Sequence, residues 1–273
     1  MDVFATGLRM GESPRWHDGR LWVCDWVAGE VLSYDVDGQR TVELTMTGLP
    51  FSVDWLLDGR TVLTSTRGVV TVEEDGSLTP YGAMDQAWNE IVVDPAGNTF
   101  VNAAGFDLMG GEEPRPGFVW VVRPDGSSEE VADGVWFPNG MAVTPDGGTL
   151  VVAESYGHCL TAFDIGPGGR LDHRRVWADL GDAAPDGICL DAEGATWYAD
   201  VPHRQCVRVA EGGEVLEVVQ ADRGCFACML GGEDGRTLYV VANEWGGTSG
   251  IGQGEPSGQL LVHRAPAPHA GRP

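Results

Sequence analysis

Lysine is absent from this chain of 273 residues, because all 17 of its basic residues are arginine. Its absence excludes a lysine Schiff base, the attachment of pyridoxal phosphate and a P-loop that depends on lysine. Positive charge is scarce as well, since 41 Asp and Glu residues give a formal net charge of −24. A chain this acidic is repelled by nucleic acids and by anionic membranes, so we expect neither as a partner.

Long apolar runs are also missing. No stretch approaches the roughly 18 residues that indicate a membrane-spanning helix. The start, Met1 to Met10, has no basic region followed by an apolar one, so we expect no signal peptide and a cytoplasmic protein. The sequence has no GxSxG motif, which argues against a serine hydrolase.

Cysteine is sparse, with six residues. The only close pair is Cys225-Phe-Ala-Cys228, which has no partner pair. It lies inside an expected strand, where we expect the two side chains to point to opposite faces and to chelate poorly. We therefore interpret all six as reduced core thiols rather than as a metal site or disulfides.

Glycine is abundant, with 40 residues, and it marks an internal repeat. Val53–Leu63 and Met141–Val151 both join an alternating apolar run to a second β-rich run through an Asp-Gly turn. Such turns favour hairpins, because glycine accepts the positive φ that they require. The spacing of roughly 40 to 50 residues is that of a four-stranded propeller blade. The repeat occurs six times, with its turn glycines at Gly19, Gly59, Gly97, Gly147, Gly194 and Gly235.

The sequence therefore predicts an all-β protein, a six-bladed β-propeller with four-stranded blades. We expect one domain over residues 1–264 and a disordered tail over residues 265–273. The insertion Gly105–Gly117, rich in Gly and Pro, is expected to form a loop over one face.

The repeat register predicts which residues begin the innermost strands, which surround the mouth of the central channel. Phe51 and Ala227 occupy two of these positions and leave one side apolar. The others bear oxygen, and two carboxylates with two amides form a site that Ca²⁺, Mg²⁺ or Mn²⁺ prefers. These four residues are Glu12, Asn89, Asn139 and Asp186. Asn-Gly and Asp-Gly are also ordinary turn pairs, which is the alternative explanation for two of them.

Four motifs taken in order resemble the SMP-30/gluconolactonase/LRE family of six-bladed propellers. They are Gly11-Glu12-Ser13-Pro14, Trp88-Asn89-Glu90-Ile91, Phe137-Pro138-Asn139-Gly140-Met141-Ala142 and Pro185-Asp186-Gly187. The resemblance implies that Glu12, Asn139 and Asp186 bind one divalent cation. It implies that Asn89 binds either the metal or the substrate. Ca²⁺ is the first choice, with Mg²⁺, Mn²⁺ and Zn²⁺ as alternatives.

The chemistry that this resemblance implies is hydrolysis of a lactone. A cation polarises the ring carbonyl and stabilises the oxyanion, while Asp186 acts as general base toward a water molecule. The two roles of Asp186 conflict, because binding a cation lowers the pKa of a carboxylate and weakens it as a base. If Asp186 is not the base, the cation itself activates the water.

One departure from the family bears on the substrate. Sugar-lactone members often carry an arginine two residues before the asparagine, where this chain has Ala87. We therefore expect a less hydroxylated lactone or a related ester, with Trp88 and Phe137 lining its pocket. His203 follows a strand of the fifth blade and is a candidate substrate contact.

Two other functions remain open at this point. The same metal site could hydrolyse phosphotriesters, or the propeller could be a non-catalytic, metal-stabilised binding module, since a fold does not fix a function. We expect a monomer or a small homo-oligomer, with a small lactone or ester as its partner.

Overall fold

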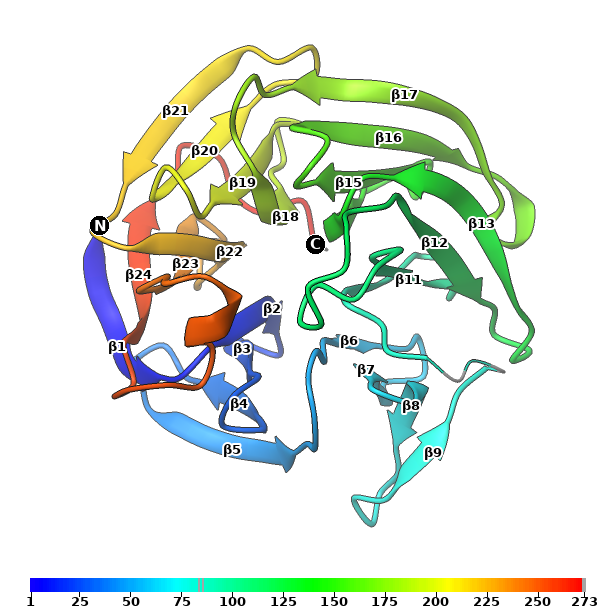
Figure 1. Cartoon of the computed structure of the whole chain (residues 1–273), viewed down its shortest axis with the longest axis horizontal. Helices are drawn as coiled ribbons and strands as arrows, with labels where there is room; N and C mark the ends of the chain where they lie inside the picture. The colour runs from blue at the N-terminus through cyan, green and yellow to red at the C-terminus, as the bar shows by residue number, and fades with distance from the viewer. Residues whose placement is uncertain (83, 85, 272–273) are drawn as a thin grey trace.

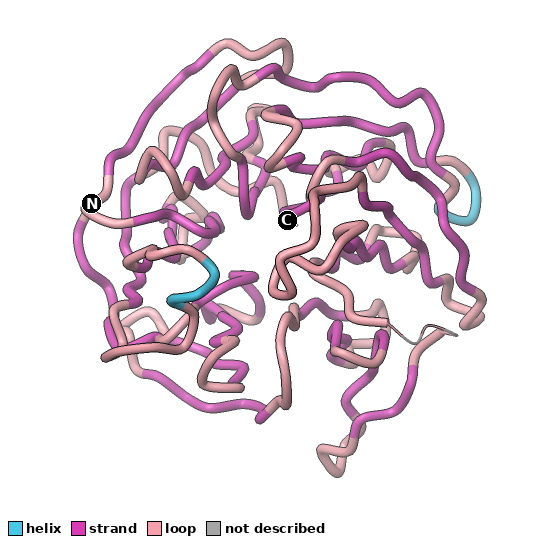
Figure 2. Tube along the Cα trace, viewed as in Figure 1, coloured by secondary structure: helices cyan, strands magenta, loops and turns pink. Residues whose placement is uncertain are grey.

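The described part of the chain forms six antiparallel sheets that stand like blades around a central axis (Figure 1). The computed structural model describes all residues except 83, 85, 272 and 273. Almost all of it is strand and loop (Figure 2), and its helical segments are the short 3₁₀ turns η1 (Pro167–Gly169) and η2 (Thr248–Gly250). Among the described residues, no helix is long and apolar enough to cross a membrane. The prediction of a six-bladed, four-stranded propeller is confirmed.

The first three blades follow one another along the chain, each from its innermost to its outermost strand. Blade 1 contains β2 (Gly11–His17), β3 (Arg20–Asp25), β4 (Glu30–Tyr34) and β5 (Arg40–Thr45). Blade 2 contains β6 (Val53–Trp55), β7 (Thr61–Ser65), β8 (Gly68–Val72) and β9 (Leu78–Pro80). Blade 3 contains β10 (Ile91–Val93), β11 (Thr99–Ala103), β12 (Gly117–Val122) and β13 (Ser128–Val135).

The last three blades continue in the same order around the ring. Blade 4 contains β14 (Pro138–Val143), β15 (Thr149–Glu154), β16 (Cys159–Ile165) and β17 (Leu171–Asp179). Blade 5 contains β18 (Pro185–Leu190), β19 (Thr196–Asp200), β20 (Gln205–Val209) and β21 (Val215–Gln220). Blade 6 contains β22 (Gly224–Gly231), β23 (Thr237–Asn243), β24 (Gly258–Arg264) and β1 (Asp2–Leu8).

Blade 6 closes the ring with strands from both ends of the chain. The first strand, β1, pairs antiparallel with the last, β24, with Asp2 opposite Val262 and Leu8 opposite Gly258. The repeat pattern did not predict this closure, because β1 lies before the first recognisable repeat. Pairing between the two ends of the chain therefore completes blade 6, and residues 9–10 lead from β1 into β2 of blade 1.

The hairpin turns are formed as the repeat predicts. All six turn glycines have positive φ, between 70° and 88°. The apolar runs that flank these turns pack between neighbouring blades. Blades 3 and 4, for example, bury Phe100, Val119, Met141 and Val152 in one cluster. Each innermost strand is thereby held against its neighbours around the channel.

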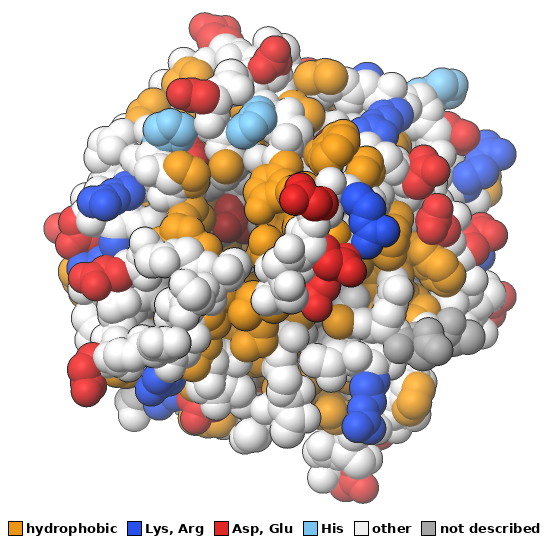
Figure 3. Space-filling view, in the orientation of Figure 1, with side chains coloured by type: hydrophobic (Ala, Val, Ile, Leu, Met, Phe, Trp, Pro, Cys, Tyr) orange, Lys and Arg blue, Asp and Glu red, His pale blue; other side chains and the backbone are white. Residues whose placement is uncertain are grey.

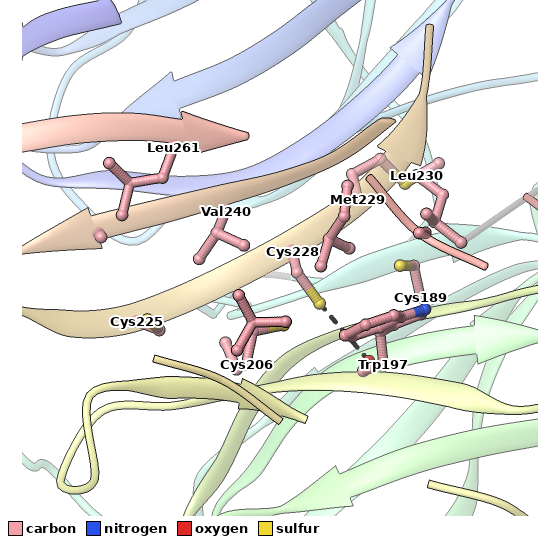
Figure 4. Packing of buried hydrophobic residues seen from close by; sticks show 14 residues of the cluster. Cys189, Trp197, Cys206, Cys225, Cys228, Met229, Leu230, Val240 and Leu261 are labelled. Atoms are coloured by element: carbon pink, nitrogen blue, oxygen red, sulfur yellow. Dashed lines mark hydrogen bonds between the residues drawn. The ribbon is translucent and has the colours of Figure 1, made fainter. Parts of the chain in front are cut away.

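Four of the cysteines lie together between blades 5 and 6 (Figure 4), where they are buried with Trp197. They are Cys189, Cys206, Cys225 and Cys228. The prediction that the close pair points to opposite faces is wrong. The pairing of β22 with β23 shifts by one residue between Cys225 and Ala227, and an extra residue in a strand reverses the faces beyond it.

The segment after β24 is also ordered, which corrects the expected disordered tail for residues 265–270. Ala265 and Ala267 are buried. The backbone N–H of Ala192 donates to the carbonyl of Pro268 (2.8 Å), and that of Ala270 donates to the carbonyl of Leu190 (3.1 Å). The segment thus lies along the turn between β18 and β19. Its Ala- and Pro-rich composition gave no sign of this, because the anchoring bonds are made by backbone atoms.

Candidate functional site

The residues predicted to hold a cation lie where the innermost strands begin, at irregularities in the sheet pairing. The pairing is shifted between Glu12 and Arg15 in β2, between Pro138 and Met141 in β14, and between Pro185 and Ile188 in β18. A β-bulge of this kind redirects side chains and is common beside active sites. Asn139 and Asp186 fall inside two of these bulges, and Glu12 lies at the edge of the third.

Two glycines allow the innermost strands of blades 4, 5 and 6 to approach closely beside Asn139 and Asp186. A Cβ on Gly140 would lie 2.6 Å from the carbonyl oxygen of Asp186, and a Cβ on Gly187 would lie 2.4 Å from the Cβ of Ala227. Both glycines belong to strands, and neither has a positive φ. The Asn-Gly and Asp-Gly pairs are therefore not turn pairs. They are sites of close approach between blades 4, 5 and 6.

The two predicted amides lie beside one another. Asn89 Nδ2 is 3.4 Å from Asn139 Oδ1 and 3.4 Å from the carbonyl oxygen of Pro138. Asn102 supports this arrangement, because its Nδ2 donates to the carbonyl of Asn139 at 2.6 Å. The Ser155 hydroxyl lies 3.5 Å from Asn139 Nδ2 and donates to the carbonyl of Pro185 at 2.7 Å. Blades 3, 4 and 5 are thus tied together around the amides.

The two predicted carboxylates influence each other. Burial raises the pKa of Glu12 well above its usual value, and the nearby charges of Asp186 and Glu90 raise it further. Burial also raises the pKa of Asp186 strongly, with contributions from Glu90 and Asp200. Asp186 is half-buried as a residue, yet its Oδ1 atom is inaccessible to solvent and accepts no hydrogen bond.

These residues fit a divalent cation. A buried carboxylate oxygen without a donor is costly unless a proton or a cation satisfies it. Within the described residues, no group of three or more His, Cys, Asp or Glu side chains could hold a metal ion. A cation here would therefore have to combine the carboxylates of Glu12 and Asp186 with amide oxygens. An all-oxygen donor set of this kind suits Ca²⁺ or Mg²⁺ better than a softer metal.

A third carboxylate, which the sequence reasoning missed, stands next to this pair. Glu90 Oε1 accepts hydrogen bonds from the Ser13 hydroxyl (3.0 Å), from Arg15 Nη2 (2.8 Å) and from the backbone N–H of Ile91 (2.8 Å). Glu90 and Arg15 are both buried. The available signal was that Glu90 directly follows Asn89 and that Arg15 lies three residues after Glu12. Nothing in the sequence indicated that the two residues pair across blades.

The three residues expected to contact the substrate differ in burial and in their neighbours. Trp88 is buried and its ring contacts those of Phe118 and Trp120, so the structure removes it from the mouth of the channel. Phe137 is half-buried beside Asn139. His203 has a 39% exposed side chain, and its Nδ1 is 2.7 Å from Oδ2 of the fully buried Asp200.

Fold and site together define a class of protein, a six-bladed propeller with carboxylate and amide side chains gathered where its innermost strands begin. The chain belongs to the SMP-30/gluconolactonase/LRE-like family, whose sequence profile matches residues 10–244. The resemblance seen in the four motifs is thereby confirmed.

Individual relatives match nearly the whole chain. It is 27% identical over 255 residues to regucalcin of Gallus gallus, covering 88% of this chain and 85% of that protein. It is 27% identical over 264 residues to the pentonolactonase XacC of Haloferax volcanii, covering 93% and 89%. The solved structure of a regucalcin from Agrobacterium tumefaciens has a TM-score of 0.78 at 20% identity, covering 97% and 95%, and shows the same fold.

Proposed function

We propose that the protein is a hydrolase that opens a lactone with the help of one divalent cation, with Ca²⁺ as the first choice. The observation that carries the proposal is the buried, unpartnered Oδ1 of Asp186 beside a second buried carboxylate and two amides. Two relatives support it. The Haloferax protein is named a pentonolactonase, and the Agrobacterium regucalcin is described as calcium-binding.

We assign separate roles to the residues of the site: cation ligands, a candidate substrate contact and a general base. Glu12, Asn139 and Asp186 would hold the cation, and the amide of Asn89 would be a further ligand or would orient the substrate. When bound, the cation supplies a Lewis acid that polarises the lactone carbonyl. Asp186 is the candidate acceptor for the proton of the attacking water. The water oxygen bonds to the carbonyl carbon, the ring C–O bond breaks, and the ring oxygen takes up a proton to give the hydroxy acid.

The direct test uses protein stripped of metal with a chelator. A panel of lactones and simple esters is assayed before and after Ca²⁺, Mg²⁺, Mn²⁺ or Zn²⁺ is restored. We expect no turnover in stripped protein and recovery with at least one ion. Absence of turnover with every ion would overturn the proposal.

The role of Asp186 is tested with Asp186→Asn, which keeps the shape of the side chain but removes its charge. We expect it to lose activity. Asp37→Asn is the matched control, because Asp37 is exposed in the β4–β5 turn. Full activity of Asp186→Asn would show that the residue is neither base nor essential ligand.

A further inference from the structure

Three aromatic rings form what we call the aromatic wall, made of Phe106, Phe137 and Tyr156. Phe137 and Tyr156 stack with centroids 4.7 Å apart, and Phe106 lies 5.7 Å from Phe137 and 6.0 Å from Tyr156. Although the rings contact one another, Tyr156 remains 41% exposed, as does the neighbouring Trp136. Figure 3 shows hydrophobic side chains gathered around the centre of the face that it views.

The aromatic wall is held rigidly beside the oxygen ligands. The backbone N–H of Ser155 donates to the carbonyl of Phe137 (3.1 Å), two residues before Asn139. The preceding residue, the buried Glu154, accepts hydrogen bonds from the backbone N–H of Trp136 (2.6 Å) and from Arg174 (2.9 Å). The rings therefore have a fixed position relative to the amides at the mouth of the channel.

Phe106 reaches the wall from a different blade. It lies on the connection between β11 and β12, which extends toward the centre of the ring (Figure 1). The ends of this connection almost touch, since a Cβ on Gly117 would lie 2.1 Å from the carbonyl oxygen of Ala103. Its tip is stabilised by its own contacts, such as Arg115 Nη2 donating to Glu112 at 2.8 Å. Phe106 joins this loop to the wall.

A second apolar surface lies on the far side of Asp186. Phe226 and Trp245 meet edge to face with centroids 5.4 Å apart, and Trp245 is 43% exposed. Phe226 precedes Ala227, the residue that Gly187 approaches closely. The proposed cation ligands are thus flanked by residues of blade 4 and of blade 6 that carry aromatic rings.

We propose that this site takes a lactone bearing a flat, apolar substituent, such as a phenyl group, which lies against the half-buried Phe137 and the exposed Tyr156 while the lactone carbonyl faces Glu12, Asn139 and Asp186. This inference rests on the proposed lactonase function. Aromatic surfaces offer a large apolar contact area without hydrogen bonds to sugar hydroxyls. Ligand sites generally combine apolar and aromatic contacts with a few polar groups that fix the orientation of the ligand.

The test compares γ-lactones that differ only in the substituent at the γ-carbon, phenyl against hydroxymethyl. In metal-loaded wild-type protein we expect kcat/KM for the phenyl lactone to be higher by about 10- to 100-fold, the range that apolar pockets achieve. Phe137→Ala and Tyr156→Ala should bring this ratio toward one. Leu57→Ala, an exposed apolar residue on blade 2, should leave the ratio unchanged. Equal or faster turnover of the hydroxymethyl lactone would overturn the inference while leaving lactone hydrolysis intact.

A binding measurement separates this inference from the proposed function. The corresponding γ-phenyl γ-lactam resists hydrolysis, and its binding is measured by calorimetry. Lactam binding that weakens in Tyr156→Ala, without turnover of any lactone, would support the apolar site and overturn the hydrolase. Lactam binding that is absent, or equal in wild type and both wall variants, would overturn the apolar site.

Discussion

Gly140 in blade 4 lies so close to Asp186 in blade 5 that a Cβ at position 140 would be 2.6 Å from the Asp186 carbonyl oxygen. The same atom would lie 2.5 Å from the backbone nitrogen of Ile188. Because these neighbours are backbone atoms, they cannot rotate away as a side chain could. The glycine after Asn139 therefore sets the separation between two of the proposed cation ligands.

Gly140→Ala is accordingly expected to disturb both stability and the site. Forcing a methyl group into this contact should lower the free energy of unfolding by about 1–3 kcal/mol. It should also weaken stabilisation by Ca²⁺, because Asn139 and Asp186 are pushed apart. Urea denaturation with and without Ca²⁺ measures both effects. Gly246→Ala is the control, since nothing lies within 4 Å of its Cβ and its φ is not positive. Equal behaviour of the two variants would contradict the argument.

The buried Arg15–Glu90 pair should behave as a unit. Removing one partner leaves an uncompensated buried charge, which costs about 3–5 kcal/mol, whereas replacing both with apolar residues is often tolerated. We therefore expect Arg15→Met to destabilise the protein severely and Arg15→Met/Glu90→Leu to recover much of the loss. A double-mutant cycle in urea gives the coupling energy. Purely additive effects would show that the 2.8 Å contact has no energetic weight.

Removal of one proposed ligand should have opposite effects without and with metal. Glu12 is a buried carboxylate whose pKa is raised by burial and by Asp186, so Glu12→Gln relieves repulsion in metal-free protein. We expect this variant to melt at a higher temperature than wild type after chelation. Added Ca²⁺ should stabilise wild type, by about 2.7 kcal/mol at 100 times its Kd, and should not stabilise Glu12→Gln.

Calorimetric melting with and without Ca²⁺ measures these changes. Glu214→Gln, at an exposed position in blade 5, should respond to Ca²⁺ like wild type. A normal Ca²⁺ response in Glu12→Gln would remove Glu12 from the ligand set.

The sequence was sufficient to predict the features of the fold that follow from periodicity. The turn glycines fixed the blade register, and the register identified Glu12, Asn139 and Asp186 as residues at the start of innermost strands. Trp88 was misplaced because consecutive side chains of an extended chain point in opposite directions, so Trp88 and Asn89 face different sides. Its ring accordingly packs against those of Phe118 and Trp120, whereas Asn89 contacts Asn139 of blade 4.

Contacts between blades could not be predicted in this way. The Arg15–Glu90 pair joins residues 75 positions apart, and the meeting of Phe106 with Phe137 depends on the path of a long loop. Neither the strand period nor the repeat length contains this information. The closure of blade 6 by β1 was missed for the same reason.

The buried thiols lead to the last prediction. Burial raises the pKa of Cys225 to about 12 and also raises that of Cys228. Since the thiolate is the reactive form, these raised pKa values make both thiols slow to react at pH 8. Cys159 is half-buried and is the most accessible of the six. We therefore expect at most one thiol per molecule to react with a disulfide reagent in native protein at pH 8. In unfolded protein we expect all six thiols to react. Cys159→Ser should abolish the native reaction. Rapid reaction of two or more thiols before unfolding would contradict the burial of the other five cysteines.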